Sequence, residues 1–330
     1  MSLVPITIAC GNYDRTRPIR EGRVVIEGCD VTYLPIEPEE IFFRAFRNHE
    51  FDVTELSFSS YIRTVADGSS QYIGIPAFVS RIFRHSGLYI RDDRGIEQPG
   101  DLKGKVVGVP EYQMTAPVWQ RGLLQDEYGV KPQDIHWRTG GQEQPGRGER
   151  TPLKPIAGVD IQPIAGNKTL SAMLEAGEID ALFSARAPSC FDRKAPHVRR
   201  LFEDSRAAEK AYYQKTGLFP IMHLVGIRKT LVQKYPWLPT SVYKAFCEAK
   251  ALAMKEVRDV SALYVTLPWL EAEAGETARI MGEDFWRYGV RENAKDIDTL
   301  TRYSFEQGLV DRKLSAEELF AKPTFEMSSI

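Results

Sequence analysis

The residues that could perform chemistry in this 330-residue chain gather in short polar segments that follow apolar, strand-like runs. The densest is Ser80-Arg81-Ile82-Phe83-Arg84-His85, which places two arginines and a histidine in six positions. The planar guanidinium of arginine matches a carboxylate or phosphate, and histidine titrates near neutral pH. This segment therefore predicts an anionic ligand held beside a group that can transfer protons.

Similar side chains follow other predicted strands. Glu55 ends one apolar run, and Arg186 follows another at residues 179–183. Because parallel sheets bind ligands outside the carboxyl ends of their strands, we expect such side chains to line one binding site. Glu111 and His223 join them as candidates for proton transfer. The remaining candidates for contact with the ligand are Asp14, Ser57, Ser59, Gln113, Thr115 and Ser189.

Each candidate also has an ordinary structural interpretation. Arg81 and Arg84 could be surface charges, and a histidine that enters a strand is often a hydrogen-bonded structural residue. Serines before a helix commonly cap it, and Glu55 could cap the element that follows. The types of residue alone leave open whether a bound ligand reacts.

Several classes of protein are excluded by missing motifs. No G-x-G-x-x-G follows a strand, and Lys103-Gly104-Lys105 is followed by valine, so neither a dinucleotide fingerprint nor a P-loop is present. G-x-S-x-G and H-E-x-x-H are absent as well. The four cysteines, which have no metal-ligand spacing, are expected to be buried thiols in a reducing compartment: Cys10, Cys29, Cys190 and Cys247.

Composition indicates an ordinary globular protein with 43% hydrophobic and 27% charged residues. The 43 basic and 45 acidic residues nearly cancel, so no bulk charge attracts nucleic acid or an anionic membrane. No apolar run approaches the roughly 20 residues that span a bilayer. The first ten residues lack the features of a secretory signal, and we expect a cytoplasmic protein.

The hydrophobic pattern predicts an α/β fold with two lobes and largely parallel sheets. Residues 24–26 and 31–36 flank a turn and predict a hairpin, while residues 138–155 predict a long loop. Similar segments that begin at His85 and His223 predict two hinge crossings between the lobes. The first lobe would comprise residues 1–91 and 223–330, with the C-terminal helices, and the inserted second lobe residues 92–222. Helices are predicted at residues 115–128, 237–257, 269–281, 296–307 and 315–320.

Several strings of sequence resemble the 4,5-dihydroxyphthalate decarboxylase family. They include Gly11-Asn12-Tyr13-Asp14-Arg15-Thr16-Arg17, Glu55-Leu56-Ser57-Phe58-Ser59-Ser60-Tyr61, Arg186-Ala187-Pro188-Ser189-Cys190-Phe191 and Thr216-Gly217-Leu218-Phe219-Pro220-Ile221-Met222-His223. The similarity extends over nearly the whole chain. Since that family is similar in fold to type II periplasmic solute-binding proteins, the resemblance implies a two-lobed α/β fold with two hinge crossings.

The resemblance also implies an enzyme of phthalate degradation that converts 4,5-dihydroxyphthalate, a small aromatic dicarboxylate, into 3,4-dihydroxybenzoate and carbon dioxide. Such an enzyme needs no organic cofactor, because the hydroxylated ring itself supplies and accepts the electrons. We expect an arginine to hold the retained carboxylate, a histidine to deliver a proton to the ring, and a glutamate to take the hydroxyl proton. The candidates are, in that order, Arg81, Arg84 and Arg186; His85 and His223; Glu55 and Glu111.

Two alternative functions stay open, together with metal binding and oligomeric state. A solute-binding protein on this scaffold would hold an aromatic carboxylate without reaction. A precursor-synthesis enzyme would need a pyridoxal-like ligand and a reactive lysine, yet Lys168 and Lys215 lie at no predicted strand end. We expect no metal, although His85, His223 and the glutamates could hold a divalent ion once folded. The sequence also leaves open whether the chain forms a homo-oligomer.

Overall fold

The computed structural model describes residues 2–149 and 153–327, and its contacts divide the chain into two compact units. Unit 1 comprises Met1–Arg81, Ile221–Asp298 and Leu314–Ile330. Unit 2 comprises Ile82–Pro220 and Thr299–Lys313. The chain passes between the units after Arg81, Pro220, Asp298 and Lys313.

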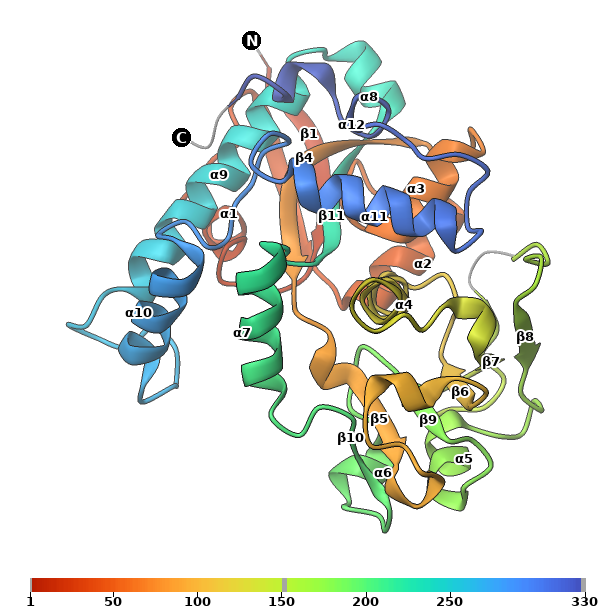
Figure 1. The fold of residues 1–330 in the computed structure, drawn as a ribbon. Helices are drawn as coiled ribbons and strands as arrows, with labels where there is room; N and C mark the ends of the chain where they lie inside the picture. The colour runs from red at the N-terminus through yellow and green to blue at the C-terminus, as the bar shows by residue number, and fades with distance from the viewer. Residues whose placement is uncertain (1, 150–152, 328–330) are drawn as a thin grey trace. The chain divides into compact units, whose positions relative to one another are not determined.

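Unit 1 is built on a five-stranded sheet with the order β2 (Cys29–Pro35), β1 (Val4–Cys10), β3 (Val53–Ser57), β11 (Ile221–Arg228) and β4 (Tyr72–Arg81) (Figure 1). β1 pairs in parallel with β2 and β3, whereas β11 runs antiparallel to both β3 and β4. β-Branched residues that suit a pleated, buried surface fill its centre. Ile8, Val53, Val225 and Ile227 are all fully buried.

The predicted hairpin at residues 24–36 is wrong. Val24 and Ile26 are buried in irregular chain rather than in a strand, and β2 pairs in parallel with β1, with Ile6 opposite Val31. Parallel strands need a crossover between them, and the short helix α1 (Arg17–Arg20) lies in that connection. Strand pairing is decided by this tertiary arrangement, which local β-propensity does not reveal.

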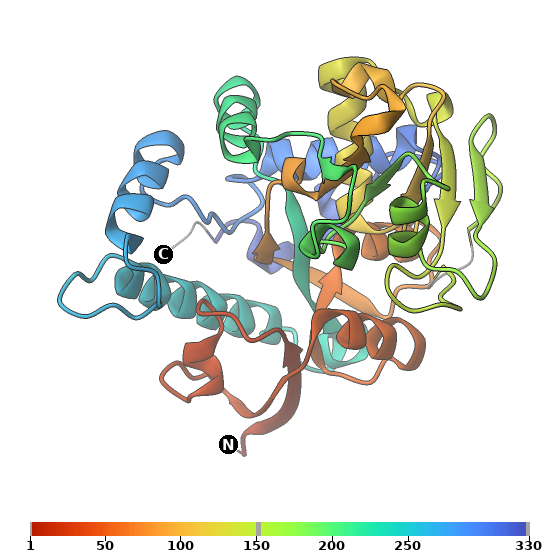
Figure 2. The same cartoon turned by 90° about the horizontal axis from the view of Figure 1, so that it is seen from below.

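Helices complete unit 1. α2 (Pro38–Asn48) begins with Pro38 and two glutamates, which suit the first turn of a helix, and packs on β3 together with α3 (Phe58–Ala66). The long helix α9 (Leu238–Val257) contacts β4, and α1 lies against it (Figure 2). The other helices of the unit are α8 (Lys229–Lys234), α10 (Leu270–Met281), α12 (Ala316–Leu319) and the 3₁₀ turn η5 (Lys322–Thr324).

Unit 2 contains a six-stranded sheet with the order β10 (Val198–Arg200), β5 (Leu88–Arg91), β9 (Ala181–Phe183), β6 (Val106–Val109), β7 (His136–Thr139) and β8 (Asp160–Pro163). The last four strands are parallel, and β5 is antiparallel to β9 and β10. Buried apolar side chains between this sheet and its helices form a core that includes Tyr89, Leu170, Leu174, Ile179 and Leu182.

The helices of unit 2 are α4 (Thr115–Tyr128), α5 (Leu170–Ala176), α6 (Ser189–Asp192) and α7 (Ser205–Thr216). α4 has the predicted bounds. No helix was predicted at α7, whose exposed face is polar. Asp204 caps its start by accepting a hydrogen bond from the Ala207 N–H at 2.9 Å. Of the predicted loop at residues 138–155, residues 140–149 and 153–155 contain neither helix nor strand, and residues 150–152 lie outside the described residues.

The helix α11 (Ala294–Glu306) begins in unit 1 and ends in unit 2. All C-terminal helices were predicted to belong to the first lobe, but contacts group residues 299–313 with unit 2. The Tyr303 ring packs edge-on against Trp119 with centroids 5.6 Å apart, and Gln307 accepts a hydrogen bond of 2.8 Å from the Arg121 guanidinium. These contacts account for the grouping.

Two predictions about the side chains and surface can be compared directly. All four cysteines are buried and form no disulfide, which confirms the expectation of buried thiols. Within the part of the chain that the structure describes, no helix combines the length and the apolar character that crossing a membrane requires.

Candidate active site

Glu55 lies in the middle of β3 and is 0% exposed. On the neighbouring strand β11, His223 is paired with Ser57, two residues beyond Glu55. Side chains two residues apart on a strand share one face of a sheet, so the register brings Glu55 and His223 together. His223 Nδ1 lies 2.6 Å from Glu55 Oε1, and its side chain remains 18% exposed.

Hydrogen-bond donors surround the Glu55 carboxylate. Oε1 also accepts a bond of 2.8 Å from the Tyr13 hydroxyl, while Oε2 accepts one of 2.8 Å from the Gly11 N–H and a longer one of 3.5 Å from Cys10 Sγ. These donors come from the end of β1 and the turn after it. A carboxylate that meets donors on both oxygens is best satisfied in its ionised form.

The pKa values follow from this arrangement. Burial alone would raise the pKa of the Glu55 carboxyl, but the hydrogen bond and charge of His223, with the bonds from Gly11 and Tyr13, outweigh burial and lower it. Burial and the Glu55 charge raise the pKa of Tyr13, so its hydroxyl keeps the proton and donates. An ionised Glu55 can only accept, so Nδ1 of His223 carries a hydrogen and Nε2 is the ring nitrogen left for chemistry.

Arg15 lies in the same turn. Its guanidinium carbon is 4.3 Å from the centroid of the Tyr13 ring and 4.2 Å from that of Trp286. Nε donates to the Val79 carbonyl at 2.7 Å, and Nη1 donates to Asp14 at 3.1 Å. Asp14, a predicted ligand contact, therefore pairs with this arginine, and its own side chain is 39% exposed.

Arg81, the first candidate for the carboxylate clamp, occupies a buried polar network. Nη1 donates to the Arg287 carbonyl at 3.1 Å and to Asn293 Oδ1 at 2.5 Å, and Nη2 lies 3.2 Å from Asp296. Its side chain and that of Asp296 are both fully buried. This geometry favours a structural role, because a substrate carboxylate would have to displace a buried ion pair.

Two serines complete the predicted residues of unit 1. Ser57 occupies the N-cap position of α3 but makes no capping bond; it accepts instead from the Ser60 hydroxyl at 3.4 Å. Ser59 lies in the first turn of α3 and is fully buried. Unit 1 therefore gathers Glu55, His223 and Ser57 on one region of its sheet.

His85 is in unit 2, in the 3₁₀ turn η1 (His85–Gly87). It is 2% exposed and packs edge-on against Phe202 and Tyr212, at centroid distances of 5.0 and 5.2 Å. Its Nδ1 is buried with no hydrogen-bond partner in the described part of the chain. Burial lowers the pKa of His85 to about 4, so the ring is neutral at pH 7. This environment disfavours the predicted role as a proton donor.

The other predicted arginines also lie in unit 2. Arg84 donates to the Ala185 carbonyl at 3.3 Å, and burial lowers its pKa to about 10 against the opposing charge of Glu209. Arg186 is exposed at the end of the loop after β9, where its N–H donates to the Ser184 hydroxyl at 3.2 Å. Both arginines therefore bond to residues of the loop that follows β9, namely Ala185 and Ser184.

The segment before α4 holds a second acidic group. Glu111 is buried and forms an ion pair of 2.7 Å with Arg147. Nearby, Glu149 accepts a hydrogen bond of 2.5 Å from the Tyr112 N–H, and burial raises its pKa to about 7. Two further predicted residues, Gln113 and Thr115, are buried at the start of α4. Ser189 is held by Glu143, to which its hydroxyl donates at 2.6 Å.

The structure also shows side chains that sequence reasoning did not select: Tyr13, Arg15 and Glu149. Tyr13 and Arg15 belong to a polar segment that follows an apolar, strand-like run. This position could have marked them as candidates for the site. Their ring contacts and bonds depend on residues far along the chain, such as Trp286. Glu149 lies in a loop without periodicity, so no sequence pattern indicated its burial.

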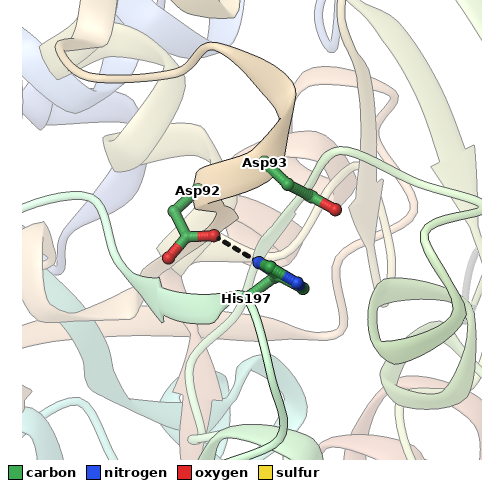
Figure 3. Close-up of side chains that lie close together, drawn as sticks. All are labelled: Asp92, Asp93 and His197. Atoms are coloured by element: carbon green, nitrogen blue, oxygen red, sulfur yellow. Dashed lines mark hydrogen bonds and ion pairs between the residues drawn. The ribbon is translucent and has the colours of Figure 1, made fainter.

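One group of three described side chains has ligand atoms close enough to share an ion: Asp92 and Asp93 in η2 (Asp92–Arg94), and His197 (Figure 3). His197 Nδ1 bonds Asp92 at 2.9 Å, and Asp93 is held by Arg91 at 2.6 and 2.9 Å. All three side chains are exposed and already paired, so we assign no ion to them.

Comparisons with known proteins give the fold. No protein-family model matches the chain. The periplasmic sulfonate-binding protein SsuA of Methylobacillus flagellatus KT superimposes with a TM-score of 0.54 at 14% identity, covering 97% of this chain and 92% of that one. The periplasmic aliphatic sulphonate binding protein SsuA of Escherichia coli gives 0.51 at 16%, covering 100% and 95%. The predicted type II periplasmic-binding-protein-like fold is thereby confirmed.

Sequence relatives give the family. A 4,5-dihydroxyphthalate decarboxylase of Comamonas testosteroni is 49% identical over 330 residues, which is 100% of both chains. A protein of the same name from Pseudomonas putida is 48% identical over 214 residues, 65% of this chain and 83% of that protein. The first match extends along the whole chain and therefore includes every segment described above. This chain belongs to the 4,5-dihydroxyphthalate decarboxylase family.

Proposed function

We propose that this protein is a carboxy-lyase that converts 4,5-dihydroxyphthalate into 3,4-dihydroxybenzoate and carbon dioxide. The observation that carries the proposal is the buried Glu55–His223 pair, found in a chain that matches a decarboxylase of that name from end to end. A carboxylate that fixes one ring nitrogen of a histidine prepares the other for proton transfer.

The chemistry requires a proton at a ring carbon. Each carboxylate of the substrate lies para to a hydroxyl, so electrons from that oxygen can move through the ring as a proton is added to the carbon that bears the leaving carboxylate. The intermediate is a dienone. Loss of carbon dioxide returns the electron pair to the ring and restores aromaticity. The protein must therefore hold the substrate, supply one proton and help remove another.

His223 is the proton donor in this proposal. Its Nδ1 is held by the Glu55 carboxylate, 2.6 Å away, and Nε2 delivers the proton. General acid catalysis of this kind contributes about 10²–10⁴-fold. The roles predicted for Glu111, Arg84 and Arg186, which all belong to unit 2, stay predictions.

The ring acts as its own electron sink, so the reaction needs no organic cofactor. The proposal includes a cytoplasmic location, which the four buried, unpaired cysteines support because thiols stay reduced there. A homo-oligomer remains a prediction, which sedimentation of the purified protein would measure.

The proposal is tested by incubating purified protein with 4,5-dihydroxyphthalate and measuring carbon dioxide and 3,4-dihydroxybenzoate. We expect turnover of this substrate, and binding without turnover of phthalate, which has the carboxylates but no hydroxyl to supply electrons. Turnover of phthalate at a comparable rate would refute the mechanism. Binding of both compounds without any reaction would identify a solute-binding protein instead.

Two matched variants then assign the proton donor. His223→Asn should lower kcat by on the order of 10²-fold or more with little change in affinity, while His85→Asn should keep most of its kcat. If only His85→Asn loses activity, the role passes to His85. If both variants remain active, the proton comes from a carboxylic acid or from water.

A further inference from the structure

We infer that Arg15 binds the substrate carboxylate that is retained in the product. The inference rests on the proposed function and adds to it the residue that recognises the ligand. It starts from the position of Arg15 in the turn after β1, the same turn that supplies Gly11 and Tyr13 to Glu55.

The guanidinium of Arg15 is held in a fixed plane. The rings of Tyr13 and Trp286 both lie against it, at 4.3 and 4.2 Å, and Nε is anchored on the Val79 carbonyl at 2.7 Å. The Trp286 ring is in turn fixed by a bond of 3.0 Å from its N–H to the Phe78 carbonyl. Such a group is already ordered before a ligand arrives, so little side-chain entropy is lost on binding.

The outer edge of this guanidinium has bonding capacity left. Within residues 2–149 and 153–327, Nη2 has no hydrogen-bond partner, and Nη1 bonds only Asp14. Asp14 is 39% exposed, and exposed ion pairs contribute little free energy. Nη1 and Nη2 together present the parallel donors that a carboxylate binds in bidentate fashion. The Arg15 side chain is 16% exposed, so these donors are sheltered but reachable.

The position also suits the reaction. The Tyr13 ring separates Arg15 from Glu55: the guanidinium lies over the ring, and the hydroxyl of that ring bonds Oε1, which also contacts His223. The charge of Arg15 accordingly acts on the ionisation of Cys10 and Tyr13. A ligand carboxylate on Arg15 would therefore bind one side chain, Tyr13, away from the Glu55–His223 pair.

Arg81 makes a useful contrast within unit 1. It was the first choice from sequence because of the basic residues around it, yet its guanidinium is engaged by Asp296 and Asn293 inside the protein. Arg15 shows the opposite combination, since its stacking contacts leave the donor edge available. The geometry therefore assigns recognition to Arg15 and structure to Arg81.

The test uses three ligands that differ in the retained carboxylate: phthalate and 3,4-dihydroxybenzoate, which have it, and catechol, which lacks it. Kd values are measured by calorimetry for the full chain and for Arg15→Lys, which keeps the charge but loses the fork. For Arg15→Lys we expect the Kd values of the two acids to rise roughly tenfold or more, as for loss of a charge-assisted hydrogen bond. The Kd of catechol should change by less than about twofold. Arg20→Lys, in the neighbouring helix α1, is the matched control and should leave all three Kd values unchanged.

Three results would overturn the inference. Arg15→Lys could bind both acids within about twofold of the unaltered protein, or it could lose catechol as strongly as the acids, which would indicate disturbed packing. Arg15→Met keeps an unbranched stem between the rings and serves as the second variant; failure of both variants to fold would assign Arg15 to structure alone. If the unaltered protein neither binds these ligands nor consumes 4,5-dihydroxyphthalate, the proposed function itself fails.

Discussion

Replacing His85 by phenylalanine should make the protein less sensitive to acid. His85 is buried against Phe202 and Tyr212, and its pKa lies near 4 instead of 6.5. Between pH 6.5 and pH 4, His85 is protonated in the unfolded chain but stays neutral in the folded one. The stability linked to this ring is therefore fully present above pH 6.5 and is lost as the pH falls toward 4.

The size of the effect follows from the two pKa values. A pKa of about 4 in place of 6.5 changes the free energy of unfolding by about 3.4 kcal/mol across the whole titration of His85. About 2.5 kcal/mol of this change falls between pH 7.5 and pH 4.5. His85→Phe keeps a flat ring between the two aromatic neighbours but removes the titrating nitrogen. Between pH 7.5 and pH 4.5, the free energy of unfolding of His85→Phe should therefore fall by about 2.5 kcal/mol less than that of the unaltered protein.

The assay is urea unfolding at pH 7.5 and pH 4.5, followed by circular dichroism, for the unaltered chain and the variant. His136→Gln, at a position with a 52% exposed side chain, controls for the loss of an imidazole. Equal acid sensitivity in His85→Phe and the unaltered chain would show that the ring titrates normally. The argument that His85 is neutral at pH 7, and therefore a poor proton donor, would then be refuted.

Three further outcomes are expected. Glu55→Gln should lower kcat by on the order of 10²-fold with a small change in KM in steady-state kinetics. The donors around Glu55 bond to two carboxylate oxygens, whereas the side-chain amide of glutamine offers only one acceptor oxygen. An unchanged kcat would contradict this. Tyr13→Phe removes a bond that lowers the Glu55 pKa, so the acid limb of the kcat/KM profile should move to higher pH, whereas an unmoved profile would leave Tyr13 without a role in the ionisation. Asp296→Ala removes the carboxylate that forms an ion pair with the buried Arg81 and should cost about 3–5 kcal/mol in urea unfolding; a loss below about 1 kcal/mol would show that this ion pair contributes little to stability.

The framework of the fold was accessible from sequence wherever a pattern is local. The predicted helix at residues 115–128 matches α4 because a helical repeat is readable within one segment. The pairing of β2 with β1 was missed, since the choice between a hairpin and a parallel neighbour depends on the crossover and not on the strand. α7 was missed because its polar residues give little apolar periodicity.

The candidate site was only partly predictable for a related reason. Glu55 and His223 were both selected, but their contact joins residues 168 positions apart and depends on β11 lying beside β3. The density of basic residues pointed to Arg81, whose partner Asn293 is 212 positions away. Charge clusters indicate which residues have chemistry to offer, whereas the distant partners decide whether that chemistry is used for structure or for a ligand.

The place of β11 in the unit 1 sheet has a consequence for how the protein is made. β11 lies between β3 and β4, yet a ribosome synthesises the whole segment Ile82–Pro220 after β4 and before β11. At about 5–20 residues per second, this interval lasts on the order of ten seconds. During that time the nascent chain contains β1 to β4 but lacks β11, which pairs with both β3 and β4. The unpaired edges of β3 and β4 are prone to aggregation, so the new chain most needs a chaperone in this interval. Glu55 acquires its histidine only when that last central strand has left the ribosome.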